Sequence, residues 1–195
     1  LAEPLDFTKL GKPKVIINAA AYTTVDKAET EAEICVRINH KAVAELAEYC
    51  FEHDILLVHY STDYVFNGAG DQPFYEDDSV NLFPLNTYGS SKLAGEKAII
   101  ASGCKYYIVR TSWVYSHEGA NFVKTMLRLG AERPELKVVN DQVGSPTSAA
   151  DIAANTLQLI EKQPPFGIYN FVPDEQLSWY EFARMIIPQT KILPI

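Results

Sequence analysis

The chain has 195 residues, of which 47% are hydrophobic and 22% are charged, and these proportions are typical of a folded globular protein rather than a disordered or collagen-like one. The 17 Lys and Arg residues are outnumbered by 25 Asp and Glu residues, and the formal net charge of -8 argues against the basic footprint that sequence-independent nucleic-acid binding requires. The longest apolar stretches, residues 15–21 and 55–60, are too short to span a bilayer. We therefore expect neither a nucleic-acid partner nor a membrane partner.

Strand-like and helix-like patterns alternate along the chain, in the order that builds parallel strand-helix-strand units. We expect strands at residues 15–18, 55–61, 106–111, 136–139 and 168–171, and helices at residues 31–53, 87–103, 121–129, 151–162 and 179–187. The helical pattern over 31–53 has a break near Asn39, and residues 67–85 form a loop rich in Gly, Asp, Pro and Asn. The alternation predicts an α/β fold with a doubly wound parallel sheet.

Small and polar residues follow three of the predicted strands, at residues 18–23, 61–64 and 111–113. In an open parallel sheet, ligands bind at the carboxyl ends of the strands. We therefore expect these three loops to converge on one edge of the sheet and to form the binding site.

Tyr88 and Lys92 are one turn apart on the predicted helix 87–103, so both side chains project from the same face. This pair suits reduction of a carbonyl by a nicotinamide, because the carbonyl oxygen must receive a proton, and a tyrosine with its ordinary pKa of about 10 holds its proton too tightly to exchange it readily near neutral pH. We expect the neighbouring ammonium to lower that pKa. A hydroxyl from Thr62 or Ser61 would complete the site by donating to the carbonyl oxygen.

Five segments carry a more specific signal: residues 18–29 (NAAAYTTVDKAE), 61–68 (STDYVFNG), 84–96 (PLNTYGSSKLAGE), 110–115 (RTSWVY) and 141–147 (DQVGSPT). In this order, over about Val15 to Ile187, the chain resembles the dTDP-4-dehydrorhamnose reductase family of the extended short-chain dehydrogenase/reductases. The resemblance implies a Rossmann-like fold that uses NADPH or NADH. It also implies reduction of the 4-keto group of dTDP-4-dehydro-L-rhamnose to dTDP-L-rhamnose, a precursor of surface polysaccharide.

The resemblance implies roles for individual residues as well. The catalytic residues would be Thr62 on the substrate carbonyl, Tyr88 as the proton donor and Lys92 as the partner of Tyr88 and a ligand of the ribose. Further cofactor contacts would be Ala19, Ala20, Ala21, Asn39 and Ser61, and further substrate contacts would be Thr23, Val25, Asp63, Tyr64 and Trp113. Asn121, with Lys124 and Arg128, could reach a nucleotide phosphate, although a solvated helix face explains these three residues equally well.

The chain also departs from the family pattern. None of its 10 glycines forms the Gly-x-Gly-x-x-Gly turn that lets backbone amides approach a dinucleotide pyrophosphate, and the residue that selects NAD or NADP is missing with it. The family has a helix where this chain has only residues 9–11, and it continues past Ile195. We expect residues 1–140 to form a dinucleotide-binding domain that is incomplete at its N-terminus, and residues 141–195 to form part of a small substrate lobe interleaved with it. We expect this chain alone to be inactive and a longer parent protein to be active.

The remaining predictions concern location, metals and alternative functions. The wide spacing of Cys35, Cys50 and Cys104 indicates reduced thiols in a cytoplasmic protein, and the 4 histidines share no metal-ligand spacing, so we expect no metal site. Two alternative functions stay open: a non-catalytic regulatory subunit of the methionine adenosyltransferase type, and a reductase or epimerase of another nucleotide sugar. A homodimer is a further expectation.

Overall fold

The computed structural model describes residues 2–3 and 5–195. The chain divides into two compact units, each built from two stretches of sequence. The first unit combines Leu1–Arg110 with Lys162–Asn170, and the second combines Thr111–Glu161 with Phe171–Ile195. Residues 122–138 pack with residues 179–194 inside the second unit, and the division into functional domains at residue 140 stays a prediction.

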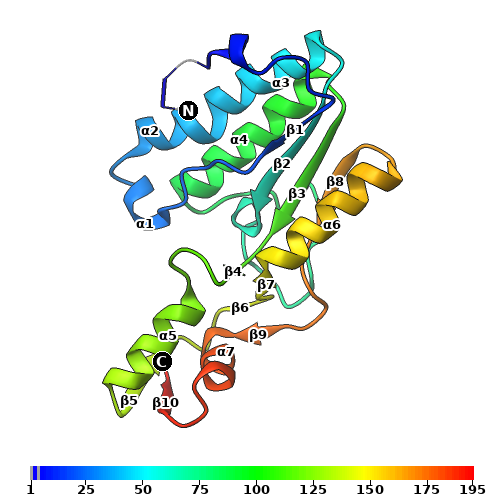
Figure 1. Cartoon of the computed structure of the whole chain (residues 1–195). Coiled ribbons are helices and arrows are strands. Elements are labelled where there is room, and N and C mark those ends of the chain that lie inside the picture. The colour runs from blue at the N-terminus through cyan, green and yellow to red at the C-terminus, as the bar shows by residue number, and fades with distance from the viewer. Residues whose placement is uncertain (1, 4) are drawn as a thin grey trace. The chain divides into compact units, whose positions relative to one another are not determined.

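A parallel sheet of four strands forms the centre of the first unit (Figure 1). The strands lie in the order β1 (Val15–Asn18), β2 (Leu56–Thr62), β3 (Tyr106–Thr111) and β8 (Gly167–Asn170). In the register of β1 with β2, Asn18 lies opposite His59. The predicted α/β fold with a parallel sheet is confirmed, and the strand ends that carry the polar loops belong to this sheet.

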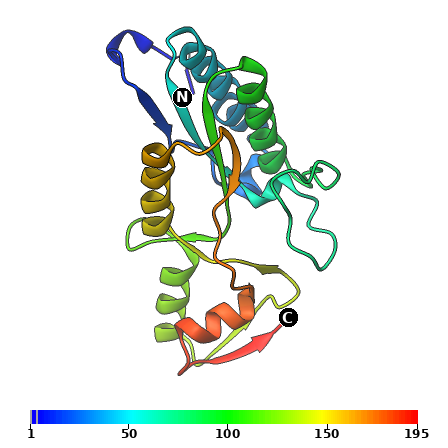
Figure 2. The same cartoon turned by 90° about the vertical axis from the view of Figure 1, so that its right-hand side faces the viewer.

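The main core lies between the sheet and the helices α3 (Ala42–Glu52) and α4 (Thr87–Ser102), which run beside one another on the same face of the sheet in Figures 1 and 2. Leu57 on β2, Ile108 on β3 and Ile99 on α4 have no exposed surface and belong to this core. Full burial of one such aliphatic side chain contributes about 1.5–3 kcal/mol. The core therefore ties α4 to the two central strands.

The helical pattern over residues 31–53 forms α2 (Ala32–Val36), a π-helical turn η2 (Arg37–Lys41) and α3. The break expected near Asn39 is this π-helical turn. Helix α4 approaches the turn closely at Gly95, where an added Cβ atom would lie 2.3 Å from the backbone oxygen of Asn39. A glycine at this position is therefore what allows α4 and η2 to pack directly together.

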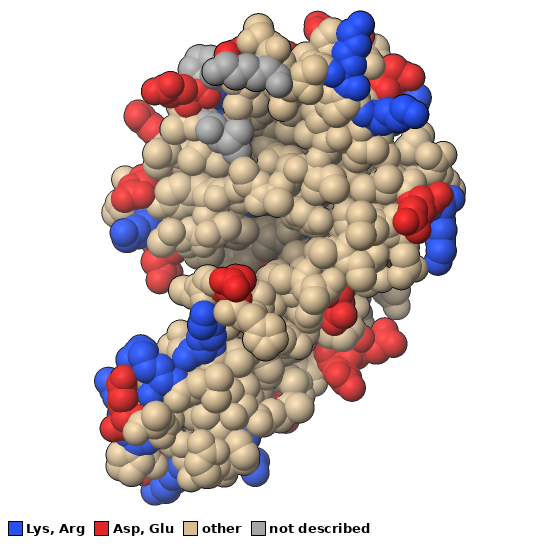
Figure 3. All heavy atoms as spheres, in the orientation of Figure 1, with Lys and Arg blue, Asp and Glu red and all other residues tan. Residues whose placement is uncertain are grey.

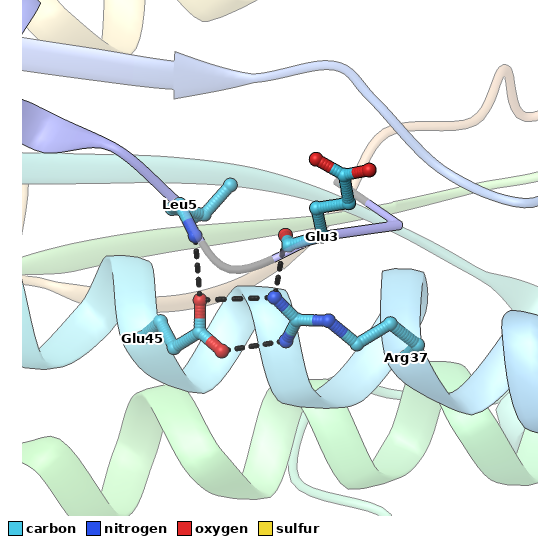
Figure 4. Close-up of polar contacts among 4 residues, drawn as sticks. All are labelled: Glu3, Leu5, Arg37 and Glu45. Carbon is cyan, nitrogen blue, oxygen red and sulfur yellow. Dashed lines mark hydrogen bonds and ion pairs between the residues drawn. The ribbon is translucent and has the colours of Figure 1, made fainter.

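The segment before β1 is anchored to η2 and α3 by polar contacts (Figure 4). Nη1 of Arg37 lies 2.5 Å from Oε1 of Glu45, and the backbone N–H of Leu5 donates to Oε2 of Glu45 at 3.1 Å. Nη2 of Arg37 also donates to the backbone oxygen of Glu3 at 2.6 Å. After the 3-10 turn η1 (Phe7–Lys9), residues 10–14 lead into β1 and contain no helix.

The second unit is built from helices and pairs of short strands. The helices are α5 (Phe122–Glu132), α6 (Ala149–Lys162) and α7 (Trp179–Ile186), and the strand pairs are β4 (Val114–Tyr115) with β7 (Thr147–Ser148), β6 (Val143–Gly144) with β9 (Leu177–Ser178), and β5 (Glu135–Val138) with β10 (Lys191–Pro194). The expectation that residues 136–139 join the main parallel sheet is wrong, because β5 pairs with β10 instead. A strand pattern indicates that a segment is extended but does not identify its partner.

Charged side chains lie in small groups on the face of the molecule drawn in Figure 3. Figure 3 shows acidic and basic side chains in small groups around a largely uncharged face.

The cysteines are free and buried. Within residues 2–3 and 5–195, no helix combines the length and the apolar character that a membrane crossing requires, and no group of three or more His, Cys, Asp or Glu side chains is arranged to hold a metal ion.

Candidate active site

Helix α4 carries Tyr88 in its first turn and Lys92 in the next. The helix begins after Asn86, whose Oδ1 accepts a hydrogen bond from the backbone N–H of Gly89 at 2.7 Å, as a favourable N-cap does. An added Cβ at Gly89 would lie 2.2 Å from the backbone oxygen of Tyr64. The glycine beside Tyr88 therefore allows the segment after β2 to lie directly against the start of α4.

Thr62, the last residue of β2, has its side chain beside the Tyr88 phenol, near enough to lower the pKa of that phenol. Its hydroxyl donates to Oδ1 of Asp63 at 2.9 Å and accepts the backbone N–H of Tyr64 at 3.2 Å, which caps the turn η3 (Asp63–Val65). Thr62 is 6% exposed, and these two hydrogen bonds hold its hydroxyl in place. The structure thus puts the predicted hydroxyl and the predicted phenol in contact.

Lys92 is only 2% exposed, and its amino group is held by acceptors on β2. Nζ donates to the backbone oxygen of Tyr60 at 2.6 Å and lies 3.1 Å from Nε2 of His59. Burial disfavours the charged form and lowers the pKa of Lys92 to about 8, although Glu96 and Cys35 act in the opposite direction. Lys92 can therefore gain or lose a proton close to neutral pH.

Burial has the opposite effect on Tyr88 and raises the pKa of its phenol to about 12. The Thr62 side chain lowers this pKa, whereas Asp63 and Tyr64 raise it further. The hypothesis that Lys92 lowers the pKa of Tyr88 is therefore wrong for this structure, because desolvation of the phenolate dominates and Nζ of Lys92 is directed toward acceptors on β2. Tyr88 remains protonated at neutral pH.

Asp63 and Tyr64, the predicted sugar contacts in η3, lie next to Tyr88. The ring of Tyr64 meets the ring of Tyr88 edge-on, with centroids 5.6 Å apart. Burial raises the pKa of the Asp63 carboxyl, although its hydrogen bond with Thr62 acts against this rise. Burial likewise raises the pKa of Tyr64. The region around the Tyr88 phenol therefore favours neutral, hydrogen-bonding groups.

The loop after β1 is held in place by Asn39 of η2. Oδ1 of Asn39 accepts the backbone N–H of Tyr22 at 2.9 Å, and Nδ2 donates to the backbone oxygen of Tyr22 at 3.0 Å and to Oγ of Ser91 at 3.0 Å. Both polar groups of Asn39, a predicted cofactor contact, thus have partners within the protein. Of the predicted residues in and after this loop, Ala19, Ala20 and Thr23 are exposed, and Ala21 and Val25 are half-buried.

Ser61, another predicted cofactor contact, belongs to a buried charged network. Its hydroxyl donates to Oε1 of Glu96 at 2.5 Å. Arg110 donates to the same carboxylate through Nε at 3.0 Å and through Nη2 at 2.7 Å. Arg110 is 2% exposed and Glu96 is 1% exposed, so this bidentate pair lies deep inside the first unit. The hydroxyl of Ser61 is therefore directed toward α4.

Trp113 and Asn121 lie in the second unit. The Trp113 indole stacks on Trp179 with ring centroids 3.4 Å apart, and an added Cβ at Gly144 would lie 2.6 Å from its Cε2 atom. The backbone of Trp113 has a φ of 45°, which is rare for a bulky residue and indicates local strain. Asn121 caps α5, because its Oδ1 accepts the backbone N–H of Lys124 at 3.1 Å.

The family model for the RmlD substrate binding domain matches residues 5–194 of this chain. The chain belongs to the dTDP-4-dehydrorhamnose reductase family. The dTDP-4-dehydrorhamnose reductase of Escherichia coli K12 is 46% identical to this family member over 184 residues, which is 92% of this chain and 61% of that protein. The chain therefore spans less than two thirds of the length of this curated relative.

Solved structures of the family have the same fold as this family member. The crystal structure of a dTDP-4-dehydrorhamnose reductase from Clostridium acetobutylicum superimposes with a TM-score of 0.92 at 41% identity, covering 97% of this chain and 68% of that one. The Bacillus anthracis dTDP-4-dehydrorhamnose reductase, solved in complex with NADP, superimposes with a TM-score of 0.90 at 42% identity, covering 94% of this chain and 66% of that one.

Sequence reasoning missed three buried polar residues around the site: His59, Glu96 and Arg110. A signal was present, because His59 interrupts an apolar run, Arg110 lies in a buried strand, and Glu96 follows Lys92 by one helical turn. A polar or charged side chain that is buried requires a hydrogen-bond partner. The identity of each partner, however, could not be read from the local pattern.

Proposed function

We propose that this chain carries the catalytic residues of a dTDP-4-dehydrorhamnose reductase, which reduces the 4-keto group of dTDP-4-dehydro-L-rhamnose to give dTDP-L-rhamnose. One observation carries the proposal: Thr62, at the carboxyl end of β2, lies beside the Tyr88 phenol, with Lys92 one turn further along the same helix. Membership of the reductase family supports the choice of substrate.

In this proposal Tyr88 donates a proton to the carbonyl oxygen as negative charge develops there. A pKa raised to about 12 keeps the phenol protonated at neutral pH, and an alkoxide is still basic enough to take its proton. Thr62 has one hydroxyl hydrogen, which Asp63 accepts in this structure, and in the proposal it turns to the carbonyl oxygen as negative charge develops there. Lys92, with a pKa of about 8, carries a proton at neutral pH one helical turn from this phenol.

The residues present fit one end of a nicotinamide cofactor. NADPH or NADH, when bound, supplies the hydride. An ammonium has three hydrogens, and Lys92 directs one of them to the backbone oxygen of Tyr60. When Nε2 of His59 is the unprotonated ring nitrogen it takes a second hydrogen, which leaves one for a ribose hydroxyl. The small side chains of Ala19, Ala20 and Ala21 leave room for a ligand beside β1. The sequence has no glycine-rich turn for the pyrophosphate, so we propose that activity requires the longer protein.

Substrate contacts are proposed from both units. Within the first unit, Asp63 and Tyr64 would hold the sugar, and Thr23 and Val25 would face the substrate. Trp113 and Asn121 of the second unit stay predicted substrate contacts. We propose that the first unit holds the cofactor and the second unit contributes to the substrate lobe. This assignment is supported by the chain order of the family motifs.

The test is oxidation of NADPH by the full-length protein in the presence of dTDP-4-dehydro-L-rhamnose, comparing Tyr88→Phe with Tyr75→Phe. Loss of the general acid should lower kcat by about 10²–10⁴-fold. The control replaces a tyrosine that is 65% exposed and should keep full activity. Turnover of Tyr88→Phe at the level of the control would remove Tyr88 from the mechanism. A wild-type protein with no turnover that co-purifies with a stoichiometric synthetase would instead support the regulatory-subunit alternative.

A homodimer and a cytoplasmic location remain predictions for the full-length protein. Light scattering with the purified protein measures the first, and cell fractionation measures the second. Assays with other nucleotide 4-keto sugars, and with NADH in place of NADPH, determine the substrate and the cofactor preference.

A further inference from the structure

His59 is a fully buried titratable residue that the proposed mechanism does not use. It lies on β2 with 0% of its surface exposed, opposite Asn18 of β1. Nδ1 of its ring lies 3.0 Å from Nδ2 of Asn18, and Nε2 lies 3.1 Å from Nζ of Lys92. The three side chains form a continuous hydrogen-bonded chain from β1, through β2, to α4.

The ring of His59 is neutral in this position. Burial lowers its pKa well below the ordinary value, and the charge of Lys92 lowers it further. A neutral imidazole has one nitrogen that donates and one that accepts. His59 can therefore offer Nε2 as an acceptor to the ammonium of Lys92 without adding a second positive charge.

We propose that His59 is a positioning residue for Lys92, which it holds together with the backbone oxygen of Tyr60. A lysine side chain has four rotatable carbon–carbon bonds, and two fixed acceptors define the direction of the remaining N–H. That N–H is the one assigned above to the cofactor ribose, so this inference rests on the proposed function. His59 itself touches neither substrate nor cofactor in the proposal.

Asn18 allows the same contact to persist when Lys92 loses its proton. With Lys92 as an ammonium, Nε2 of His59 accepts and Nδ1 carries the hydrogen, so the amide oxygen of Asn18 is the matching partner. With Lys92 as a neutral amine, Nε2–H donates to it and the amide nitrogen of Asn18 donates to Nδ1. The second state keeps the hydrogen bond that Oδ1 of Asn18 accepts from the backbone N–H of Ala20 at 3.2 Å. The first state requires the amide to turn and give up this bond, which leaves the N–H of an exposed residue to water.

The other charged or titratable groups near Lys92 do not replace this contact. Glu96 lies one turn further along α4, but Arg110 and Ser61 bind its carboxylate. Cys35 of α2 has Ser91 as its neighbour at 3.2 Å. Tyr88, one turn before Lys92 on α4, has its phenol beside Thr62.

The test uses the full-length protein and three substitutions at one position. The variant His59→Gln keeps an amide near the position of Nε2, His59→Asn keeps an amide only near Nδ1, and His59→Leu removes both polar atoms. His117→Gln, at an exposed loop position, is the matched control. The readouts are the pH profile of kcat/KM and the titration of Lys92 followed by NMR of 13C-labelled lysine, assigned with Lys92→Arg.

We expect His59→Leu and His59→Asn to lower kcat/KM by about tenfold or more and to lower the pKa of Lys92, because the ammonium loses an acceptor in a buried site. His59→Gln should keep kcat/KM within about threefold of wild type and should keep the pKa of Lys92 near its wild-type value. If His59→Leu does not fold, the comparison of His59→Gln with His59→Asn still tests the inference. Unchanged titration of Lys92 in His59→Asn, or rescue by Asn and not by Gln, would overturn the inference. If the wild-type protein has no reductase activity but Lys92 titrates as predicted in the variants, the proposed function fails and the positioning role stands.

Discussion

Replacing Arg110 with methionine tests the buried charge pair of the first unit. Methionine keeps an unbranched apolar stem that can lie against the Phe66 ring, which the guanidinium covers at 5.0 Å, but it removes the hydrogen bonds to Glu96. The Glu96 carboxylate, 1% exposed, would then have Ser61 as its hydrogen-bond partner. Removing one member of a buried pair costs about 3–5 kcal/mol. This is a large share of the ~5–15 kcal/mol that stabilises a typical native protein.

Urea unfolding followed by far-UV circular dichroism measures this loss, with Arg128→Met as the matched control. Arg128 and Glu132 form a pair at 3.1 Å whose side chains are 60% and 52% exposed, and exposed helical pairs contribute about 0.3–0.5 kcal/mol. Adding Glu96→Leu to Arg110→Met should recover much of the stability, because no charge is then left unpaired. A loss for Arg110→Met no larger than that of the control would refute the reasoning.

Two further predictions concern Trp113 and Lys92. Gly144→Ala should displace the Trp113 indole, because the new Cβ would lie 2.6 Å from it, whereas Gly167→Ala meets no atom within 4 Å. The 2 tryptophans of the chain are the stacked pair, so near-UV circular dichroism reports the change, and an unaltered signal would contradict the packing. Because the pKa of Lys92 falls from 10.5 to about 8 on folding, the unfolded chain binds more protons between these values. The wild type should therefore gain stability relative to Lys92→Met as the pH rises from about 8 to 10.5. Urea unfolding at both ends of this range measures the gain, and a constant difference would contradict the lowered pKa.

Local sequence was sufficient to predict the elements around the site. The apolar runs at residues 15–18 and 55–61, and the helical pattern over residues 87–103, indicated strands and a helix where the structure has them. These features depend on the backbone preferences of neighbouring residues and on the periodicity of apolar positions. The pairing of β5 with β10 was not predictable in this way, because the partner strand lies at residues 191–194.

By itself, the sequence determined that Tyr88 and Lys92 share one face of a helix, since the helical repeat produces that geometry wherever the helix packs. Only the tertiary structure decided their protonation, because burial raises the pKa of Tyr88 to about 12 and lowers that of Lys92 to about 8. It also decided that Ser61 and Asn39 bind other protein groups and that His59 meets Lys92. The physical reason is that desolvation and hydrogen-bond partners come from segments that are distant along the chain, and local spacing does not specify them.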